Sequence, residues 1–302
     1  MIGYLFLSLA LFAGLSKGYC GKQTSNVAKN ISDAMLINAI RMCLCFIIGI
    51  IIILFQKNQS ILPNNPKVVW IALLSGISTA CFTVSWLLSV NKKVYMMVET
   101  FVMAGVIIPL VLSNILYSEA IGIIQILGII LLMIAVYLMC TYDKTGKVRP
   151  SFKELLLLLF CSLSSGLSDF SQKIFVKELP DASIAQLNLY TYLFAALFLG
   201  ITCAIYFSKI EKYNESKSNP VKLIKPIAHY ILIMAVCLFL NSYFKTLAAK
   251  YLDAVLLYPL NQGCGVVFSL IMSVVLFKEK INLKGIFGIV LMLVSVYIIN
   301  FL

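Results

Sequence analysis

The sequence predicts an all-α membrane protein of ten transmembrane helices, arranged as two inverted five-helix repeats. Hydrophobic residues make up 61% of the 302 residues and charged residues only 12%, which leaves too little polar surface to cover a soluble globule of this size. The chain divides into ten apolar runs, and each run of about 20 to 25 residues is long enough to cross a hydrocarbon core of roughly 30 Å. An internal duplication is the third observation.

The duplication relates the stretch Gly105–Tyr137 to the stretch Gly265–Tyr297, which align without a gap. Identical pairs include Gly105/Gly265, Leu110/Leu270, Glu119/Glu279, Gly128/Gly288, Val136/Val296 and Tyr137/Tyr297. Shared hydrophobicity alone does not place the same glutamate in the same turn between two apolar runs, so a duplicated unit is the economical interpretation. Each half holds an odd number of helices, so the second half enters the membrane from the opposite side and the repeats are inverted.

The first repeat, residues 1–142, contains five of the apolar runs. They are Ile2–Gly21, Asp33–Phe55, Val68–Val90, Val94–Tyr117 and Ala120–Tyr142. The first run lacks the basic start and the small-residue cleavage site of a signal peptide, so we expect it to be a retained helix. The loop Gln56–Lys67 carries two prolines, and the last two runs are separated by the short Ser118-Glu119 turn.

A linker of residues 143–153 leads to the second repeat, residues 154–302. Its apolar runs are Glu154–Val176, Ile184–Phe207, Ile227–Ala249, Ala254–Phe277 and Ile281–Leu302. Lysine and arginine are concentrated in the loops that follow the odd-numbered runs, and by the positive-inside rule this places both termini outside the cytoplasm.

Composition and motifs exclude several classes of function. The net charge of +12 comes mostly from short loops between the runs, so it indicates membrane orientation and no nucleic-acid partner. His229 is the only histidine, which leaves histidine metal sites and Ser-His triads without a second member. The nine cysteines form no CxxC pair and are expected to be small buried residues. We therefore expect no catalytic residue, no metal, no cofactor and no enzymatic activity.

Ionisable residues inside the apolar runs are the first candidates for a binding site, because a charge at the bilayer centre costs about 2.5 to 3.5 kcal/mol. They are Lys17, Arg41, Glu99, Asp169, Lys173 and Lys245. Those near the end of a run have the alternative of extending to the interface. Lys17 and Asp169 follow matching Gly-Leu-Ser triplets, so they either neutralise each other or bind the two ends of a zwitterion. Glu99 and Asp169 are the candidates for proton coupling.

Polar and aromatic side chains extend this set. Tyr258, Asn261 and Gln262 surround Pro259, and a proline within a membrane helix often marks a bend beside a cavity. The predicted substrate-binding residues are Lys17, Trp86, Glu99, Asp169, Asn241, Tyr243, Tyr258, Asn261 and Gln262. For each aromatic residue the alternative is packing against lipid. Gly14, Gly166, Gly263 and Gly265 are expected at close contacts between helices.

The paired turn glutamates are predicted to be structural. We expect Glu119 and Glu279 at opposite membrane faces, each accepting backbone N–H bonds at the start of the fifth or tenth helix, where the helix dipole favours an anion.

These features together resemble the EamA branch of the drug/metabolite transporter superfamily. The resemblance rests on the five-plus-five arrangement, the turn glutamates, the runs Ile121–Ile129 and Ile281–Ile289, and the Ala-Ala-Lys-Tyr-Leu-Asp-Ala segment ahead of Pro259. It implies a carrier of small metabolites, drugs or amino acids in which helices 1 to 4 and 6 to 9 surround a central cavity. It also implies that both termini lie inside, which disagrees with the charge count.

The sequence hypothesis is a secondary transporter, an exporter or exchanger, that moves a small polar solute by alternating access. One alternative is a nucleotide-sugar or phosphorylated-metabolite antiporter, which requires Lys17, Arg41, Lys173 and Lys245 to converge. A membrane scaffold without transport activity is the alternative of a different class. The expected partners are a small-molecule substrate and the lipid bilayer, in a monomer or homodimer, and the expected location is the plasma (inner) membrane of a bacterium.

Overall fold

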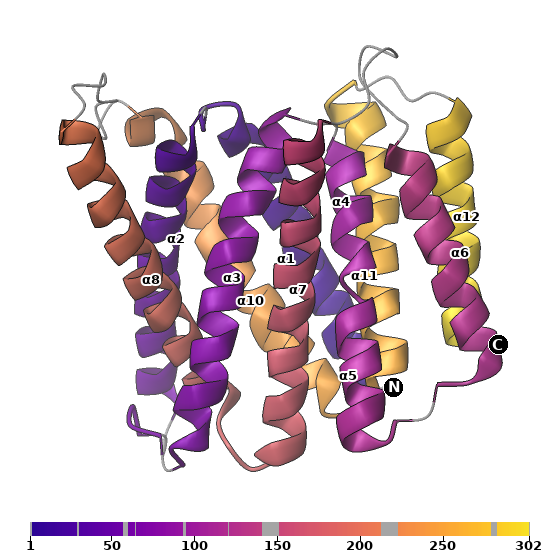
Figure 1. Ribbon diagram of the computed structural model, residues 1–302. Helices are drawn as coiled ribbons and strands as arrows, with labels where there is room; N and C mark the ends of the chain where they lie inside the picture. The colour runs from indigo at the N-terminus through magenta and orange to yellow at the C-terminus, as the bar shows by residue number, and fades with distance from the viewer. Residues whose placement is uncertain are drawn as a thin grey trace.

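The computed structural model describes residues 2–28, 30–56, 60–63, 65–92, 95–119, 121–140, 151–212, 223–278 and 283–301, and their regular structure is entirely helical (Figure 1). The helices before residue 141 are α1 Ile2–Ser25, α2 Ile31–Phe55, α3 Lys67–Lys92, α4 Tyr95–Ala104, α5 Ile107–Tyr117 and α6 Ile123–Cys140. Those that follow are α7 Phe152–Glu178, α8 Ile184–Lys212, η1 Lys225–Ile227, α10 Ala228–Ala249, α11 Ala254–Ile271, the π-helical η2 Met272–Leu276 and α12 Leu283–Phe301.

Eight stretches of the described residues are helical, long and apolar enough to cross a membrane, and α6 and α12 contain two shorter apolar helices. The outward surface fits this assignment, because large apolar side chains such as Phe12, Phe55, Trp70 and Ile123 are more than 70% exposed. Such exposure is expected where lipid is the solvent. The all-α, multi-pass membrane prediction is confirmed.

The predicted fourth helix, Val94–Tyr117, is interrupted. Gly105 and Val106 form a turn between α4 and α5. Pro109 explains the break, because proline has no N–H to donate to the carbonyl of Gly105 and its ring would clash with that carbonyl in a continuous helix. The backbone of α7 packs at this point: a Cβ added to Gly166 would meet the carbonyl oxygen of Gly105, and one added to Gly105 would meet that of Ser162.

Gly166→Ala is therefore expected to destabilise the protein by more than the usual overpacking cost of about 1–3 kcal/mol, because the atom in the way is backbone and has no rotamer to change. Gly265→Ala is the matched control, since nothing lies within 4 Å of a Cβ there. The prediction that Gly265 lies at a close helix contact is wrong. Thermal unfolding in detergent should show a lower Tm for Gly166→Ala alone, and equal Tm values for the two variants would contradict this account.

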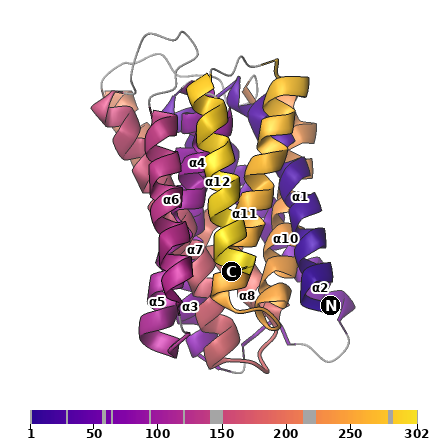
Figure 2. The same ribbon diagram turned by 90° about the vertical axis from the view of Figure 1, so that its right-hand side faces the viewer.

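Helices from the two ends of the chain interleave in the bundle. The most extensive packing joins α1 to α10, α3 to α7, α2 to α8 and α6 to α12. Helices α6 and α12 lie side by side in both views, at the right-hand edge in Figure 1 and facing the viewer in Figure 2. A hydrogen bond of 2.6 Å from Ser295 Oγ to the carbonyl of Gly128 joins these two helices. The interleaving leaves α1, α2, α3, α4, α7, α10 and α11 around the centre, where the candidate site lies.

Candidate functional site

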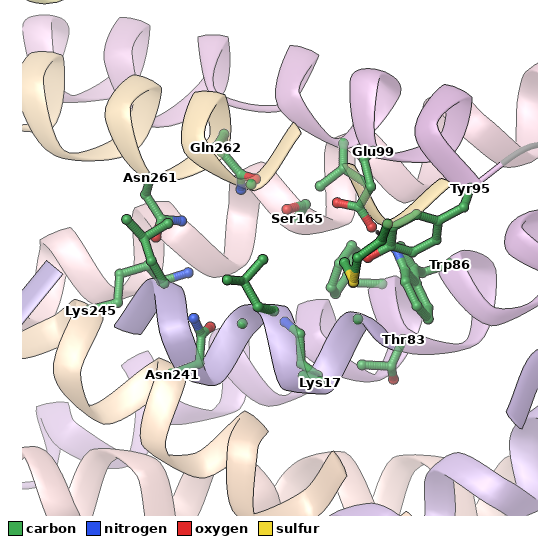
Figure 3. A pocket seen from close by; sticks show the side chains of 18 of the residues that line it. Lys17, Thr83, Trp86, Tyr95, Glu99, Ser165, Asn241, Lys245, Asn261 and Gln262 are labelled. Carbon is green, nitrogen blue, oxygen red and sulfur yellow. Dashed lines mark hydrogen bonds between the residues drawn. The ribbon is translucent and has the colours of Figure 1, made fainter. Parts of the chain in front are cut away.

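A cavity of about 110 Å³ lies inside the bundle, between helices of both sequence halves (Figure 3). Its polar lining residues are Lys17, Arg41, Thr83, Trp86, Tyr95, Glu99, Ser165, Asn241, Lys245, Asn261 and Gln262. Six of the nine predicted substrate-binding residues are among them, and Asp169, Tyr243 and Tyr258 are not. Thr83, Tyr95 and Ser165 were missed by sequence reasoning, because neutral polar residues are common in membrane helices and these three match no motif.

Three glycines on α1 make room for the lining side chains. A Cβ on Gly14 would lie 3.2 Å from the amide nitrogen of Asn241, and a Cβ on Gly18 would collide with the hydroxyl of Tyr95. A Cβ on Gly21 would come within 2.6 Å of the Trp86 ring. Because these positions lack side chains, polar and aromatic groups of α10, α4 and α3 reach the surface of α1 itself. Gly14 therefore lies at a close contact, as the sequence predicted.

Glu99 is held on one side of the cavity by aromatic residues. The indole Nε1 of Trp86 donates a hydrogen bond of 2.8 Å to Glu99 Oε1. Trp86 packs edge to face on Tyr95, with ring centroids 6.1 Å apart, and Tyr95 lies next to the carboxylate in Figure 3. A charge-assisted hydrogen bond of this kind fixes the position of the carboxylate.

Lys17 extends into the cavity from α1, on the side opposite Glu99 (Figure 3). Among the described residues no carboxylate lies within ion-pair distance of its Nζ. The charged groups that act on it across the cavity are Arg41, Lys245, Glu99 and Asp169. Of the two alternatives for Lys17 and Asp169, the mutual ion pair is not formed in the described structure.

Asp169 pairs with Lys245 of α10 instead. Asp169 is 2% exposed and Lys245 8%, and Gln262 Nε2 approaches the second carboxylate oxygen at 3.4 Å. Asp169 thus lies behind Lys245 and Gln262, which line the cavity while Asp169 does not. The equivalence of Lys17 and Asp169 in the duplicated sequence did not reveal this partner, because Lys245 belongs to a different helix of the same half.

The two predicted tyrosines lie away from the cavity lining. Tyr258 is fully buried, and its hydroxyl donates a hydrogen bond of 2.8 Å to the backbone carbonyl of Asp169. Tyr243 lines a second, wider cavity of about 890 Å³ near Glu178 and Lys250, where its hydroxyl accepts a hydrogen bond of 3.4 Å from Gln56 Nε2. Both residues were placed in the substrate site by sequence, and in this conformation they support the surrounding structure.

The amide side chains have defined roles. Asn241 Nδ2 donates a hydrogen bond of 2.7 Å to the carbonyl of Ala10 and so ties α10 to α1. Asn261 Oδ1 is buried and has no hydrogen-bond partner in the described structure. An unsatisfied buried acceptor that faces a cavity is a natural contact for a ligand donor or an ordered water.

Glu119 forms a separate ionic cluster at one end of the bundle. Its Oε1 lies 2.8 Å from Lys173 Nζ and 3.0 Å from Lys177 Nζ, and its Oε2 accepts a hydrogen bond of 3.1 Å from the backbone N–H of Ala254. Burial alone would raise the pKa of the Glu119 carboxyl, but these partners outweigh burial and lower the pKa below its usual value. Lys173 also lies 3.9 Å from Asp253.

The predicted cap at Glu119 is therefore on a different helix. Glu119 stabilises the first turn of α11 and not the start of the helix that follows it, because the short turn places it against α7 and the α10–α11 connection. Glu279 lies outside the described residues. Lys173 is engaged in this cluster and does not line the central cavity, so the four cations required by the nucleotide-sugar hypothesis do not converge.

The membrane-spanning helices enclose a buried polar cavity, an arrangement typical of membrane transporters. The chain belongs to the EamA-like transporter family, whose family model matches residues 1–141 and again residues 152–301. The chain is 30% identical over 104 residues to the quaternary ammonium compound-resistance protein QacG of Staphylococcus sp. (strain ST94), a match that covers 34% of this chain and 90% of that protein.

A solved structure titled "Crystal structure of protein" has a similar fold. It superposes with a TM-score of 0.67 at 12% sequence identity and covers 96% of each chain.

Proposed function

We propose that the protein is a secondary transporter that carries a small polar organic solute across the membrane by alternating access. The observation that carries this proposal is the buried polar cavity, whose lining comes from α1, α2, α3 and α4 of the first half and from α7, α10 and α11 of the second. When one half of a chain rocks against the other, a site between them opens first to one side of the membrane and then to the other. The proposed halves are residues 1–142 and 154–302 with a linker of residues 143–153, and the last two linker residues already belong to α7, which begins at Phe152.

The helix packing supports an inverted relation between the halves. Helices α1 and α3 of the first half pack on α10 and α7 of the second, and α1 and α7 are the first helices of their halves while α3 and α10 are the third. A two-fold axis that relates the halves places the first helix of each half beside the third helix of the other. The last helices, α6 and α12, pack against each other and run in opposite directions (Figure 1).

The Glu119 cluster is the contact that closes one end in this arrangement. It joins the turn after α5 in the first half to α7 and α11 in the second. For the cavity to open toward that end, Glu119 must separate from Lys173 and Lys177. Their separation exposes the carboxylate and the two ammonium groups to water, and this hydration compensates part of the lost attraction.

Glu99 is the carboxylate among the described lining residues and is proposed to carry the coupling proton. Glu99→Gln keeps an oxygen acceptor for Trp86 but removes the titrating group. In reconstituted liposomes we expect this variant to lose pH-driven accumulation by roughly tenfold or more and to retain solute exchange, because exchange moves no net proton. Equal accumulation by the variant and the wild type would show that Glu99 carries no coupling proton.

The proposed function is tested with the purified full chain in liposomes. Amino acids, short carboxylates, cationic drugs and nucleotide sugars are first screened as stabilisers in thermal unfolding, and each stabiliser is then tested as a radiolabelled solute for saturable uptake and counterflow. We expect at least one small solute to show both. The name of QacG makes quaternary ammonium compounds a necessary part of the screen. Absence of uptake and counterflow for every solute would favour the membrane scaffold.

The cavity volume argues against the nucleotide-sugar alternative. The central cavity has a volume of about 110 Å³ in this conformation. A short organic molecule is compatible with this volume, whereas a nucleotide sugar requires a much larger opening of the bundle. Stabilisation by nucleotide sugars alone would reverse this preference.

A further inference from the structure

The charges around the central cavity do not balance. Lys245 and Asp169 neutralise each other in a buried ion pair. Of the remaining ionisable lining residues, Lys17 and Arg41 are cationic and Glu99 is anionic, so the cavity carries a formal charge of +1. A charge enclosed in a bundle of apolar helices is costly unless a counter-charge reaches it.

Among these groups, Arg41 is a buried cation with an unsatisfied hydrogen-bond donor in the described structure. Its side chain is 3% exposed, and its Nε is buried without a hydrogen-bond partner. The titratable groups that act on its guanidinium most strongly are the Cys45 thiol and the Tyr192 phenol, and no described carboxylate lies within ion-pair distance of it. Removing water from a guanidinium without pairing it leaves donors aimed at an absent acceptor.

Lys17 of α1 has the same deficiency. Its ammonium has three donors and, among the described residues, no ion-pair partner, while Trp86 already occupies one oxygen of Glu99. Two cationic donors from α1 and α2 therefore line one small cavity. An anion with two oxygens satisfies both, and an arginine fork is well suited to a carboxylate.

We propose that the transported solute is a small organic monoanion whose carboxylate binds between Lys17 and Arg41. This inference rests on the proposed transport function and names the substrate class of the same cavity. A single negative charge brings the site to neutrality, and the cavity, about 110 Å³ in volume, is compatible with a short acid. The apolar remainder contacts the apolar part of the lining, which consists of Leu11, Leu15, Phe82, Val102 and Met272.

Asn261 extends this specificity to substituted acids. Its buried Oδ1 lacks a donor, so a hydroxyl or amino group on the solute satisfies it. An α-hydroxy acid such as lactate is then expected to bind more tightly than the unsubstituted acid of the same length, by roughly three- to tenfold for one neutral hydrogen bond.

The test uses the full chain in detergent and in liposomes with four probes of similar size: propionate, lactate, the neutral amide propionamide, and tetramethylammonium. Binding is measured by isothermal titration calorimetry and transport by currents on a solid-supported membrane. The two carboxylates are expected to bind at least tenfold more tightly than propionamide, and tetramethylammonium is expected not to bind. Tighter binding of tetramethylammonium than of either carboxylate, or no binding of any carboxylate, would overturn the proposal.

Variants assign the binding to the two cations. Lys17→Gln and Arg41→Gln are each expected to weaken lactate binding by roughly ten- to a hundredfold, the loss of one charge-assisted hydrogen bond. Arg41→Lys keeps the charge without the fork and should recover part of the affinity, and it serves as the test if Arg41→Gln does not fold. Lys67→Gln is the control, because Lys67 is exposed and pairs with Glu178 at 3.3 Å, away from the cavity.

The outcomes separate this inference from the transport function. Lactate binding that is unchanged in Lys17→Gln and Arg41→Lys contradicts the proposed contacts even when transport is intact. Saturable transport of cations or neutral solutes, with no carboxylate bound, contradicts the substrate class and leaves the transporter proposal standing. Carboxylate binding that depends on Lys17 and Arg41 without any counterflow supports the site and contradicts transport.

Discussion

Asp169→Asn is expected to lower the free energy of unfolding by about 3–5 kcal/mol, because it leaves the buried ammonium of Lys245 without its counter-charge. Lys245 is 8% exposed, and its partner in the structure is Asp169. The neighbouring Gln262 cannot replace the lost negative charge, because its Nε2 is also a hydrogen-bond donor directed at residue 169. Chemical denaturation in micelles, followed by tryptophan fluorescence, measures the loss.

A double-mutant cycle identifies the partner. Asp169→Asn combined with Lys245→Met should recover a large part of the stability lost in either single variant, because no charge is then left unpaired. Asp169→Asn combined with Lys17→Met should be additive, since these two side chains form no ion pair. Recovery in the second combination and not in the first would show that Lys17 is the true partner. The exposed pair Lys67 and Glu178 is the control, with an expected coupling below about 1 kcal/mol.

Glu119→Gln is expected to lower the free energy of unfolding by about 3 kcal/mol at neutral pH, the lower end of the range for breaking a buried pair. Lys173 has only 1% of its side chain exposed and loses its partner at 2.8 Å, whereas Lys177 is 37% exposed and regains hydration. The amide keeps an acceptor for the N–H of Ala254, so the variant isolates the charge. Glu178→Gln, which affects an exposed pair, is expected to change little.

The same variant should alter the pH dependence of stability. The pKa of Glu119 in the folded protein lies below its usual value, which is about 4.3 in an unfolded chain. Its contribution is then complete above that pH and is lost as the pH falls through the lower, folded pKa. Acidification from pH 6 should destabilise the wild type more than Glu119→Gln, so that their denaturation midpoints converge. A constant difference between them at every pH would contradict this role for Glu119.

The sequence by itself determined the membrane class, the all-helical fold and the family. These follow from local properties, because an apolar run of sufficient length must form a helix in lipid wherever its neighbours lie. The starts of the described helices differ from the predicted ones by a few residues. The interruption at Gly105 was also present in the sequence, since Pro109 cannot continue a helix hydrogen bond to that residue, although sequence reasoning did not use it.

Only the tertiary structure decided which charges meet. Lys17 and Asp169 occupy equivalent positions in the repeat, but equivalent residues contact each other only when they lie close to the axis that relates the halves. Asp169 pairs with Lys245 on a helix that packs beside its own. Glu119 pairs with Lys173 and accepts a hydrogen bond from the first turn of α11. Arg41 and Lys17 line the cavity, and no described carboxylate lies within ion-pair distance of either. Ion pairs depend on distances of a few ångströms between helices far apart in sequence, and helix packing alone sets these distances.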